Sequence, residues 1–179
     1  MPCPIQELQI VEIGNDATAL LAPLREGRSM GLLSEAGCPA IADPGAALVE
    51  AAHREGFRVV PLIGPSSIVL ALMASGLEGQ RFAFCGYLPR DKSERDRRIR
   101  ELERRSRRER ETEIFIETPY RNDALAAALL DACAPSTRLC VASDLTMATE
   151  SIATRSISEW RKSVPKLGKR PTVFLFLAK

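Results

Sequence analysis

Two short segments of this 179-residue sequence combine small residues, hydroxyls and turn formers in a way that suits ligand binding. The first runs from Ser34 to Ala42, nine residues between an apolar run and the Asp43-Pro44 pair. A loop between a strand and a helix ordinarily has about 2–6 residues. Small residues such as Ala36 and Gly37 would let a ligand approach the backbone closely. The segment is therefore either a binding loop or an unusually long connection.

The second segment is Gly64-Pro65-Ser66-Ser67, which places two hydroxyls where an apolar helix is predicted to begin. The free N–H groups and positive dipole of a helix start favour a carboxylate or another polar ligand group. The alternative is that Ser66 only caps the helix.

The elements that must position these segments follow a strand-helix-strand-helix order. The alternating pattern of residues 6–13 and the apolar runs at residues 30–33 and 58–63 predict strands. Helices are expected from Asp16 to Glu26, from Asp43-Pro44 to Gly56, and from Ile68 to Ser75. This order predicts a parallel sheet covered by helices, with ligands beyond the carboxyl ends of its strands. We therefore expect an amino-terminal α/β domain over residues 1–79.

The second half predicts another domain, over residues 80–179, beyond a polar hinge at residues 77–80. We expect it to contain a mixed sheet, so the fold class is α/β with two α/β domains. Its expected strands are 81–89, 113–117, 138–143, 152–157 and 172–177, and its expected helices are 91–108 and 122–133. Trp160 is expected to pack in a core, and Cys133 and Cys140 to be small buried hydrophobes.

Composition excludes several classes of function. Apolar residues make up 45% and charged residues 27%, which is typical of a globular protein. No apolar run approaches the roughly 20 residues of a membrane span, and the start lacks a signal-peptide layout. Five cysteines without a Cys-x-x-Cys pair, and one histidine, argue against a metal site. Reduced thiols and a cytoplasmic location are expected.

Taken together, several motifs resemble the tetrapyrrole methylase superfamily of S-adenosylmethionine-dependent methyltransferases. They most resemble the branch that methylates a ribose 2′-hydroxyl of small-subunit ribosomal RNA. The matching segments, in order, are Ser34-Glu35-Ala36-Gly37-Cys38-Pro39, Asp43-Pro44-Gly45, the run from Val59 to Ser67, Phe84-Cys85-Gly86-Tyr87-Leu88-Pro89, Ile116-Glu117-Thr118-Pro119-Tyr120-Arg121 and Asp144-Leu145-Thr146.

This resemblance implies a homodimeric enzyme that holds S-adenosylmethionine in a cleft between its two domains, mainly through backbone groups. Glu117 is then a candidate catalytic base, although it is also placed to end a strand and pair with Arg121. The implied cofactor-binding residues are Ser34, Ala36, Gly37, Cys38, Pro39, Ile41, Pro65, Ser66 and Ser67. Two alternatives remain: a porphyrinoid acceptor, or a catalytically silent homologue that serves as a binding or dimerisation module.

The sequence departs from the family pattern in three places. The family's first strand and Gly-rich loop do not precede Met1, which predicts an incomplete first domain with an exposed sheet edge and tight self-association. Cys38 and Glu35 replace the usual Thr and Asp, and Tyr120 stands where His is frequent. Only the first departure bears on activity itself.

The strongly charged stretch at residues 90–111 holds eleven Lys or Arg against seven Asp or Glu. Arginine forks match phosphate oxygens in pairs, so this helix is a candidate RNA contact. The alternative is a solvated helix with ion pairs four residues apart, Glu94 with Arg98 and Glu101 with Arg105. The candidate RNA-binding residues are Arg97, Arg98, Arg104, Arg105 and Arg108.

Overall fold

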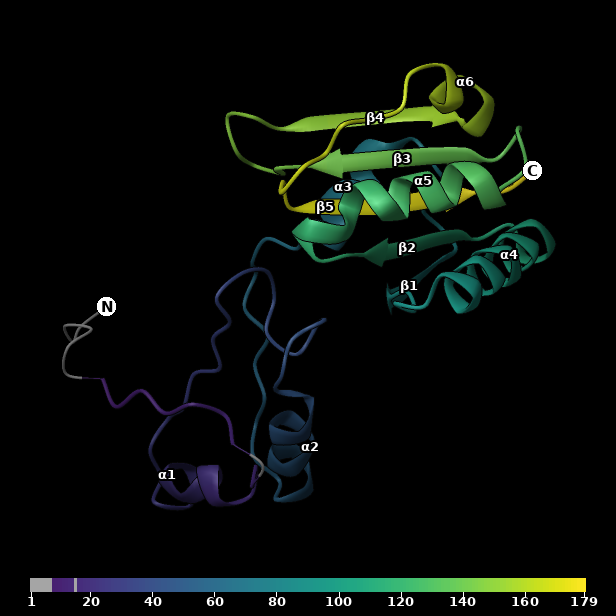
Figure 1. Cartoon of the computed structure of the whole chain (residues 1–179). Coiled ribbons are helices and arrows are strands. Elements are labelled where there is room, and N and C mark those ends of the chain that lie inside the picture. Colours follow the sequence, from purple (N-terminus) through teal and green to yellow (C-terminus); the bar gives the residue numbers. More distant parts are fainter. Residues whose placement is uncertain (1–7, 15) are drawn as a thin grey trace. The chain divides into compact units, whose positions relative to one another are not determined.

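A computed structural model describes residues 8–14 and 16–179, and the chain divides into two compact units, Met1–Pro65 and Ser66–Lys179 (Figure 1). The division falls earlier than the expected boundary at residue 79. It places the helix that follows Ser66 with the second unit.

The first unit is helical and irregular in its described part. Its elements are the 3-10 helix η2 (Ala19–Leu21) and the helices α1 (Ala22–Arg25) and α2 (Ala46–Arg54). Leu21, Ala51 and Ala52 form a small core, against which Leu24, Leu48 and Phe57 pack.

The strands expected at residues 30–33 and 58–63 do not form. Residues 8–13 of the first expected strand are not a strand either, and residues 6 and 7 of that strand lie outside the described residues. The expected parallel sheet is therefore not present in residues 8–14 and 16–65. A strand exists through its pairing with another strand, and these segments have no such partner within the described chain. Leu62 and Ile63 accordingly lie in solvent, with 87% and 108% relative exposure.

The helix predictions fare better in this unit. The expected helix 16–26 forms as η2 and α1, and Gly27 follows it with a φ of 77°. The helix after Asp43 also forms, but Asp43 and Pro44 are not its cap and first residue. Gly45 is the N-cap, because a φ of 133° there turns the chain into α2.

The second unit is built on a five-stranded mixed sheet of order β1-β2-β5-β3-β4 (Figure 1). β1 and β2 are parallel, and the other neighbours are antiparallel. The elements are α3 (Ser67–Ser75), β1 (Phe82–Tyr87), α4 (Lys92–Glu109), β2 (Thr112–Ile116), η3 (Pro119–Arg121), α5 (Asn122–Ala132), β3 (Arg138–Ser143), β4 (Ser151–Ser156), α6 (Ile157–Lys162) and β5 (Thr172–Leu177).

Alternate residues of the strands divide the core between the two faces of this sheet. Phe115 packs against Phe174 and Phe176 on the face covered by α4, α5 and α6, with ring centroids 6.0 and 5.6 Å apart. Ile114 and Leu175 face the other way, toward α3. This alternation is the period of two expected for a sheet buried on both sides.

Polar anchors tie α4 to the rest of the unit. Glu103, on the inner face of α4, accepts hydrogen bonds from the backbone N–H of Ala134 and from the Thr137 hydroxyl, just before β3. Ser106 accepts the N–H of Ala178 at 2.9 Å. The helix is therefore held at both the start of β3 and the end of β5.

The sequence did not predict α6, although Ser156 and Glu159 form a capping box at its start. The Ser-x-x-Glu spacing was the available signal. Trp160 on α6 is buried and its Nε1 donates to the Leu139 carbonyl at 2.9 Å, so its predicted role as a packing anchor is confirmed. Cys133 and Cys140 are buried, also as predicted.

Candidate functional site

The loop at residues 34–42 has an open backbone. The amides of Glu35, Ala36, Gly37 and Cys38 donate to no described residue. The bonds made here are Ile41 N–H to the Cys38 carbonyl at 3.2 Å and the Ser34 hydroxyl to the Gly37 carbonyl at 3.4 Å. Backbone groups without internal partners need water or a ligand. The loop therefore offers donors to a polar ligand.

This loop also has an unusual backbone conformation. Gly37 has a φ of 79°, and two residues with side chains, Ala40 and Ala42, have φ values of 63° and 60°. Non-glycine residues at positive φ are uncommon and concentrate at functional positions. Sequence reasoning named Gly37 but missed Ala40 and Ala42, for which only their small size was a signal.

The loop lies against the Gly64-Pro65 turn within the first unit. The Cys38 thiol contacts the carbonyl oxygens of Pro65 at 3.4 Å and Gly64 at 3.7 Å. Two segments 26 residues apart in the sequence are thus in contact. The structure brings together the Cys38 and Pro65 ends of the predicted cofactor site.

Ser66 and Ser67 follow Pro65 directly and begin the second unit. Ser66 is the N-cap of α3, with φ −128° and ψ 120°, but its side chain makes no capping hydrogen bond. Its carbonyl accepts the Leu70 N–H at 2.9 Å. Ser66 is therefore the N-cap residue, as the alternative expected, although its hydroxyl makes no capping bond. Both hydroxyls are unengaged among the described residues.

The remaining predicted cofactor residues are accessible to a ligand. Ala36 and Pro65 are exposed, Ser34 and Pro39 are half-buried, and the Ile41 side chain is 52% exposed. An exposed branched aliphatic residue beside open amides suits a ligand with both an apolar and a polar part.

Glu117 follows β2 and is nearly buried, at 6% relative exposure. Oε2 accepts a hydrogen bond from the Arg121 guanidinium, and Oε1 accepts the N–H of Thr118 at 2.7 Å and its hydroxyl at 3.2 Å. Both oxygens are therefore occupied by residues of the same turn. This geometry favours the Arg121 ion pair over the role of general base.

The outward face of α4 carries most of the predicted RNA contacts. Arg97 and Arg108 are strongly exposed, with side chains 73% and 72% accessible, and Arg104 is exposed as well. The expected pairs Glu94–Arg98 and Glu101–Arg105 are wrong. Glu101 instead lies within 3.8 Å of Arg97 and 3.4 Å of Arg98. These are weak, solvated contacts.

Arg105 was predicted to contact RNA, but its side chain points inward. Its Nε donates to Glu113 Oε1 at 2.7 Å, Nη2 donates to the other oxygen, and Glu113 is fully buried. Cys85 joins the cluster, its thiol 3.2 Å from Glu113. Burial, with the Glu113 hydrogen bond, raises the pKa of Cys85 to about 11, so it stays a thiol. Arg105 therefore anchors α4 to β2.

Arg100 and Arg107 complete the outward face, and sequence reasoning missed both. They are exposed and lie at helical spacing from Arg97 and Arg104. The available signal was the three- and four-residue spacing of arginines. The buried residues of α4, Ile99 and Leu102 among them, lie on the opposite face.

The Asp144-Leu145-Thr146 segment forms a constrained turn after β3. Asp144 and Thr146 have φ values of 52° and 69°. Asp144 Oδ2 accepts Arg170 Nε at 2.7 Å and the Thr149 hydroxyl at 2.8 Å. The Arg170 hydrogen bond, aided by Thr149, lowers the pKa of the Asp144 carboxyl.

Residues 8–14 and 16–179 contain no cluster of three or more His, Cys, Asp or Glu suited to a metal ion. Nor does any helix in that part of the chain have the length and apolar character needed to cross a membrane.

The site and fold define a two-unit α/β protein with an open, glycine-bearing loop. Its residues 9–160 match the family model described as tetrapyrrole (corrin/porphyrin) methylases. The chain therefore belongs to the tetrapyrrole methylase family, and the family recognised from the motifs is confirmed.

Curated relatives point to one branch of that family. The chain is 44% identical over 102 residues to a protein of Halalkalibacterium halodurans named ribosomal RNA small subunit methyltransferase I, covering 57% of this chain and 34% of the relative. It is 36% identical over 143 residues to the protein of that name from Vibrio cholerae, covering 80% and 48%. The chain thus spans at most about half the length of these relatives.

Solved structures agree on the fold. The methyltransferase CobJ superimposes with a TM-score of 0.61 at 21% sequence identity, covering 90% of this chain and 70% of that one. The likeness confirms the predicted α/β fold class.

Proposed function

We propose that this chain carries the S-adenosylmethionine-binding part of a methyltransferase that acts on a ribose 2′-hydroxyl of small-subunit ribosomal RNA. Membership of the methylase family and the likeness to proteins named ribosomal RNA small subunit methyltransferase I support this function. The observation that carries it is the contact of Cys38 with Gly64 and Pro65, which joins the two predicted cofactor segments. A ribosomal substrate also supports a cytoplasmic location.

The residues present fit S-adenosylmethionine. Open amides at Glu35, Ala36 and Gly37 suit hydrogen-bond acceptors of the nucleoside and the amino acid, and the exposed Ile41 suits the flat face of adenine. The hydroxyls of Ser66 and Ser67 bond to no described residue, so they also suit polar groups of the cosubstrate. When bound, this cosubstrate supplies an electrophilic methyl group on a sulfonium. The chain's own task is to orient it, since alignment with the acceptor hydroxyl supplies much of the acceleration.

The test uses a pair of matched glycines. Gly37 and Gly56 have φ values of 79° and 78°, and an added Cβ would meet no atom within 4 Å at either position. Gly37→Val and Gly56→Val therefore impose the same backbone strain in the same unit. Isothermal titration with S-adenosylmethionine should show at least tenfold weaker binding for Gly37→Val, about 1.4 kcal/mol, and little change for Gly56→Val.

Equal affinities in both variants would remove the loop from the cofactor site. Wild-type protein that shows no heat of binding at millimolar ligand would favour the alternative of a silent binding module. Transfer of a labelled methyl group to small ribosomal subunits that lack the modification tests the acceptor. Labelling of a porphyrinoid instead of the subunits would contradict the RNA assignment.

We also propose that the protein associates with itself through the first unit. Leu33, Val60, Leu62 and Ile63 are exposed there, which is more apolar surface than a small monomeric unit ordinarily leaves in water. Light scattering at micromolar concentration should give the mass of a dimer. The double variant Leu62→Glu/Ile63→Glu should shift it to a monomer, and an unchanged mass would place the contact elsewhere.

A further inference from the structure

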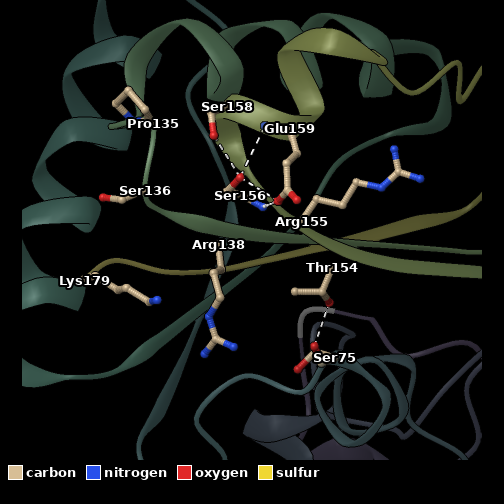
Figure 2. A pocket seen from close by; sticks show the side chains of 10 residues that line it. All are labelled: Ser75, Pro135, Ser136, Arg138, Thr154, Arg155, Ser156, Ser158, Glu159 and Lys179. Carbon is tan, nitrogen blue, oxygen red and sulfur yellow. Dashed lines mark hydrogen bonds between the residues drawn. The ribbon is translucent and has the colours of Figure 1, made fainter.

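A hollow of about 680 Å³, lined mostly by polar and charged residues, lies in the second unit, where β3 begins and β4 ends. Figure 2 shows the side chains that line it, including the cations Arg138, Arg155 and Lys179. Ser136 and Ser158 add hydroxyls, and Glu159 is the acidic side chain among the lining residues. None of these residues belongs to the cofactor loop or to the outward face of α4.

The two arginines are held in place before any ligand arrives. Arg138 Nη1 donates to the Gly76 carbonyl at 3.2 Å, and its Nε is buried without a hydrogen-bond partner among the described residues. The Arg155 guanidinium lies 4.7 Å from the centre of the Trp160 ring, a cation–π contact. Trp160 is itself fixed by its bond to Leu139. Less conformational entropy is then lost when either guanidinium binds an anion.

The acid of the hollow is already engaged. Glu159 Oε2 accepts the backbone N–H of Ser156 at 2.8 Å and its hydroxyl at 2.6 Å in the capping box. These bonds lower the pKa of Glu159, so it stays ionised, and its charge is directed at Ser156. The side chains that line the hollow thus include three cations and one committed carboxylate, so their net charge is positive.

The hollow is connected to the basic face of α4. Arg107 Nε donates to the Lys179 carbonyl at 2.6 Å, and Lys179 lines the hollow. Arg97, Arg100, Arg104 and Arg107 lead along α4 toward this end of the sheet, where the carboxyl end of β5 lies (Figure 1). All these residues belong to the second unit, so their arrangement does not depend on the first.

We propose that the hollow is a phosphate-binding site for the backbone of RNA, and that it extends the α4 arginines into one continuous track. The inference rests on the proposed ribosomal RNA substrate. Arg138 with Lys179 contacts one phosphate, and Arg155 on the other side of β4 contacts another. Arginine matches phosphate oxygens with paired donors, and hydroxyls such as those of Ser136 and Ser158 complete such sites. The site recognises the backbone and not the base sequence.

The test measures binding of fluorescein-labelled single-stranded RNA to the full chain, without S-adenosylmethionine, over a salt series. Each lost phosphate contact reduces the slope of log K against log salt by about 0.7 for single strands. Arg138→Gln/Arg155→Gln should therefore reduce the slope by about 1.4. Arg54→Gln is the control, because it removes one exposed cation from the first unit, outside the proposed track. Its slope should match the wild type.

A second variant tests the hollow without removing any contact of the folded protein, so a folding defect cannot explain its effect. Ser136 is exposed and its hydroxyl makes no bond to a described residue, so Ser136→Glu adds a charge without removing a contact. It should weaken RNA binding at least tenfold at low salt with an unchanged melting temperature. If the wild type binds RNA and neither variant alters the binding, the hollow is not on the RNA path. If the wild type itself binds no RNA, both this inference and the RNA substrate are wrong, whatever the titration with S-adenosylmethionine shows.

Discussion

The two units of this chain differ in how much regular secondary structure and buried core they contain. The second unit has a paired five-stranded sheet with a core on each face. The first has three short helical elements around a few buried side chains, and its described residues include no strand. The candidate cofactor loop lies in the first unit, and the candidate RNA surfaces lie in the second. The chain thus joins a sparsely packed region with the candidate cofactor loop to a basic region built on a paired sheet.

The difference between the units shows how strongly strand formation depends on partners. Residues 58–63 are as apolar as many strands of the second unit, yet they stay unpaired and exposed. Residues 172–177 form β5 because β2 and β3 bond to both of its edges. Local sequence supplies the propensity, and neighbours supply the hydrogen bonds.

Amide hydrogen exchange should show the largest difference between the two units. Backbone amides of β5 are paired on both sides and should open only with the whole sheet, whereas those of residues 58–63 should have opening free energies near zero. Exchange followed by mass spectrometry on peptides of the two segments measures this. Equal protection in both would mean that residues 58–63 are paired in solution.

Removal of the Phe115 ring should produce the next largest effect. It is fully buried against Phe174 and Phe176, so Phe115→Ala should lower the free energy of unfolding by about 3–5 kcal/mol. Trp160, the single tryptophan, reports on the second unit in urea titrations. Leu21→Ala, in the small core of the first unit, is the control and should leave that transition in place. A matching shift would show that the units unfold together.

The Asp144 turn should show a pH-dependent effect of intermediate size. Because the folded pKa is lowered, the carboxylate contributes stability above its unfolded pKa of about 3.9, and that contribution disappears as pH falls through the folded value. Asp144→Asn should therefore have a lower urea midpoint than the wild type at neutral pH. The gap should close in acid. A gap independent of pH would mean that Arg170 does not act through the charge.

The smallest expected effect concerns the outward face of α4. Glu101 lies near Arg97 and Arg98 in contacts that are solvated, so Glu101→Gln should change stability by no more than about 0.5 kcal/mol. The same change frees two arginines and should strengthen RNA binding in a filter assay. Weaker binding would mean that Glu101 positions Arg97 for its contact. Glu111→Gln, beside the inward-facing Arg105, is a matched control for the loss of one negative charge.

Sequence reasoning predicted the second unit nearly element by element because its helices and strands carry clear periodic patterns. Arg138–Ser143 and Thr172–Leu177 form strands with the expected bounds. It missed α6, whose six residues are too few to show a helical period. In the first unit it predicted strands from apolar runs alone, which say nothing about partners.

The candidate site was predicted unevenly for a similar reason. The family motifs identified Gly37 and Pro65 as candidate cofactor residues. The contact between Cys38 and Pro65 brings their two segments together. The inward turn of Arg105 depends on Glu113, a residue of the neighbouring strand, which local helix spacing does not reveal. The hollow at Arg138 draws on residues from α3, β3, β4, α6 and the segment after β5, so no single motif describes it.

The two anchors on the inner face of α4, Glu103 and Ser106, have a consequence for any polyanion that spans the helix and the hollow. Glu103 fixes the turn that leads to Arg138, and Ser106 fixes the end of β5 beside Lys179. The spacing between the outer arginines and the hollow is thus built into the sheet. An RNA strand that engaged both, as proposed, would therefore meet positive charges at a spacing fixed by the fold.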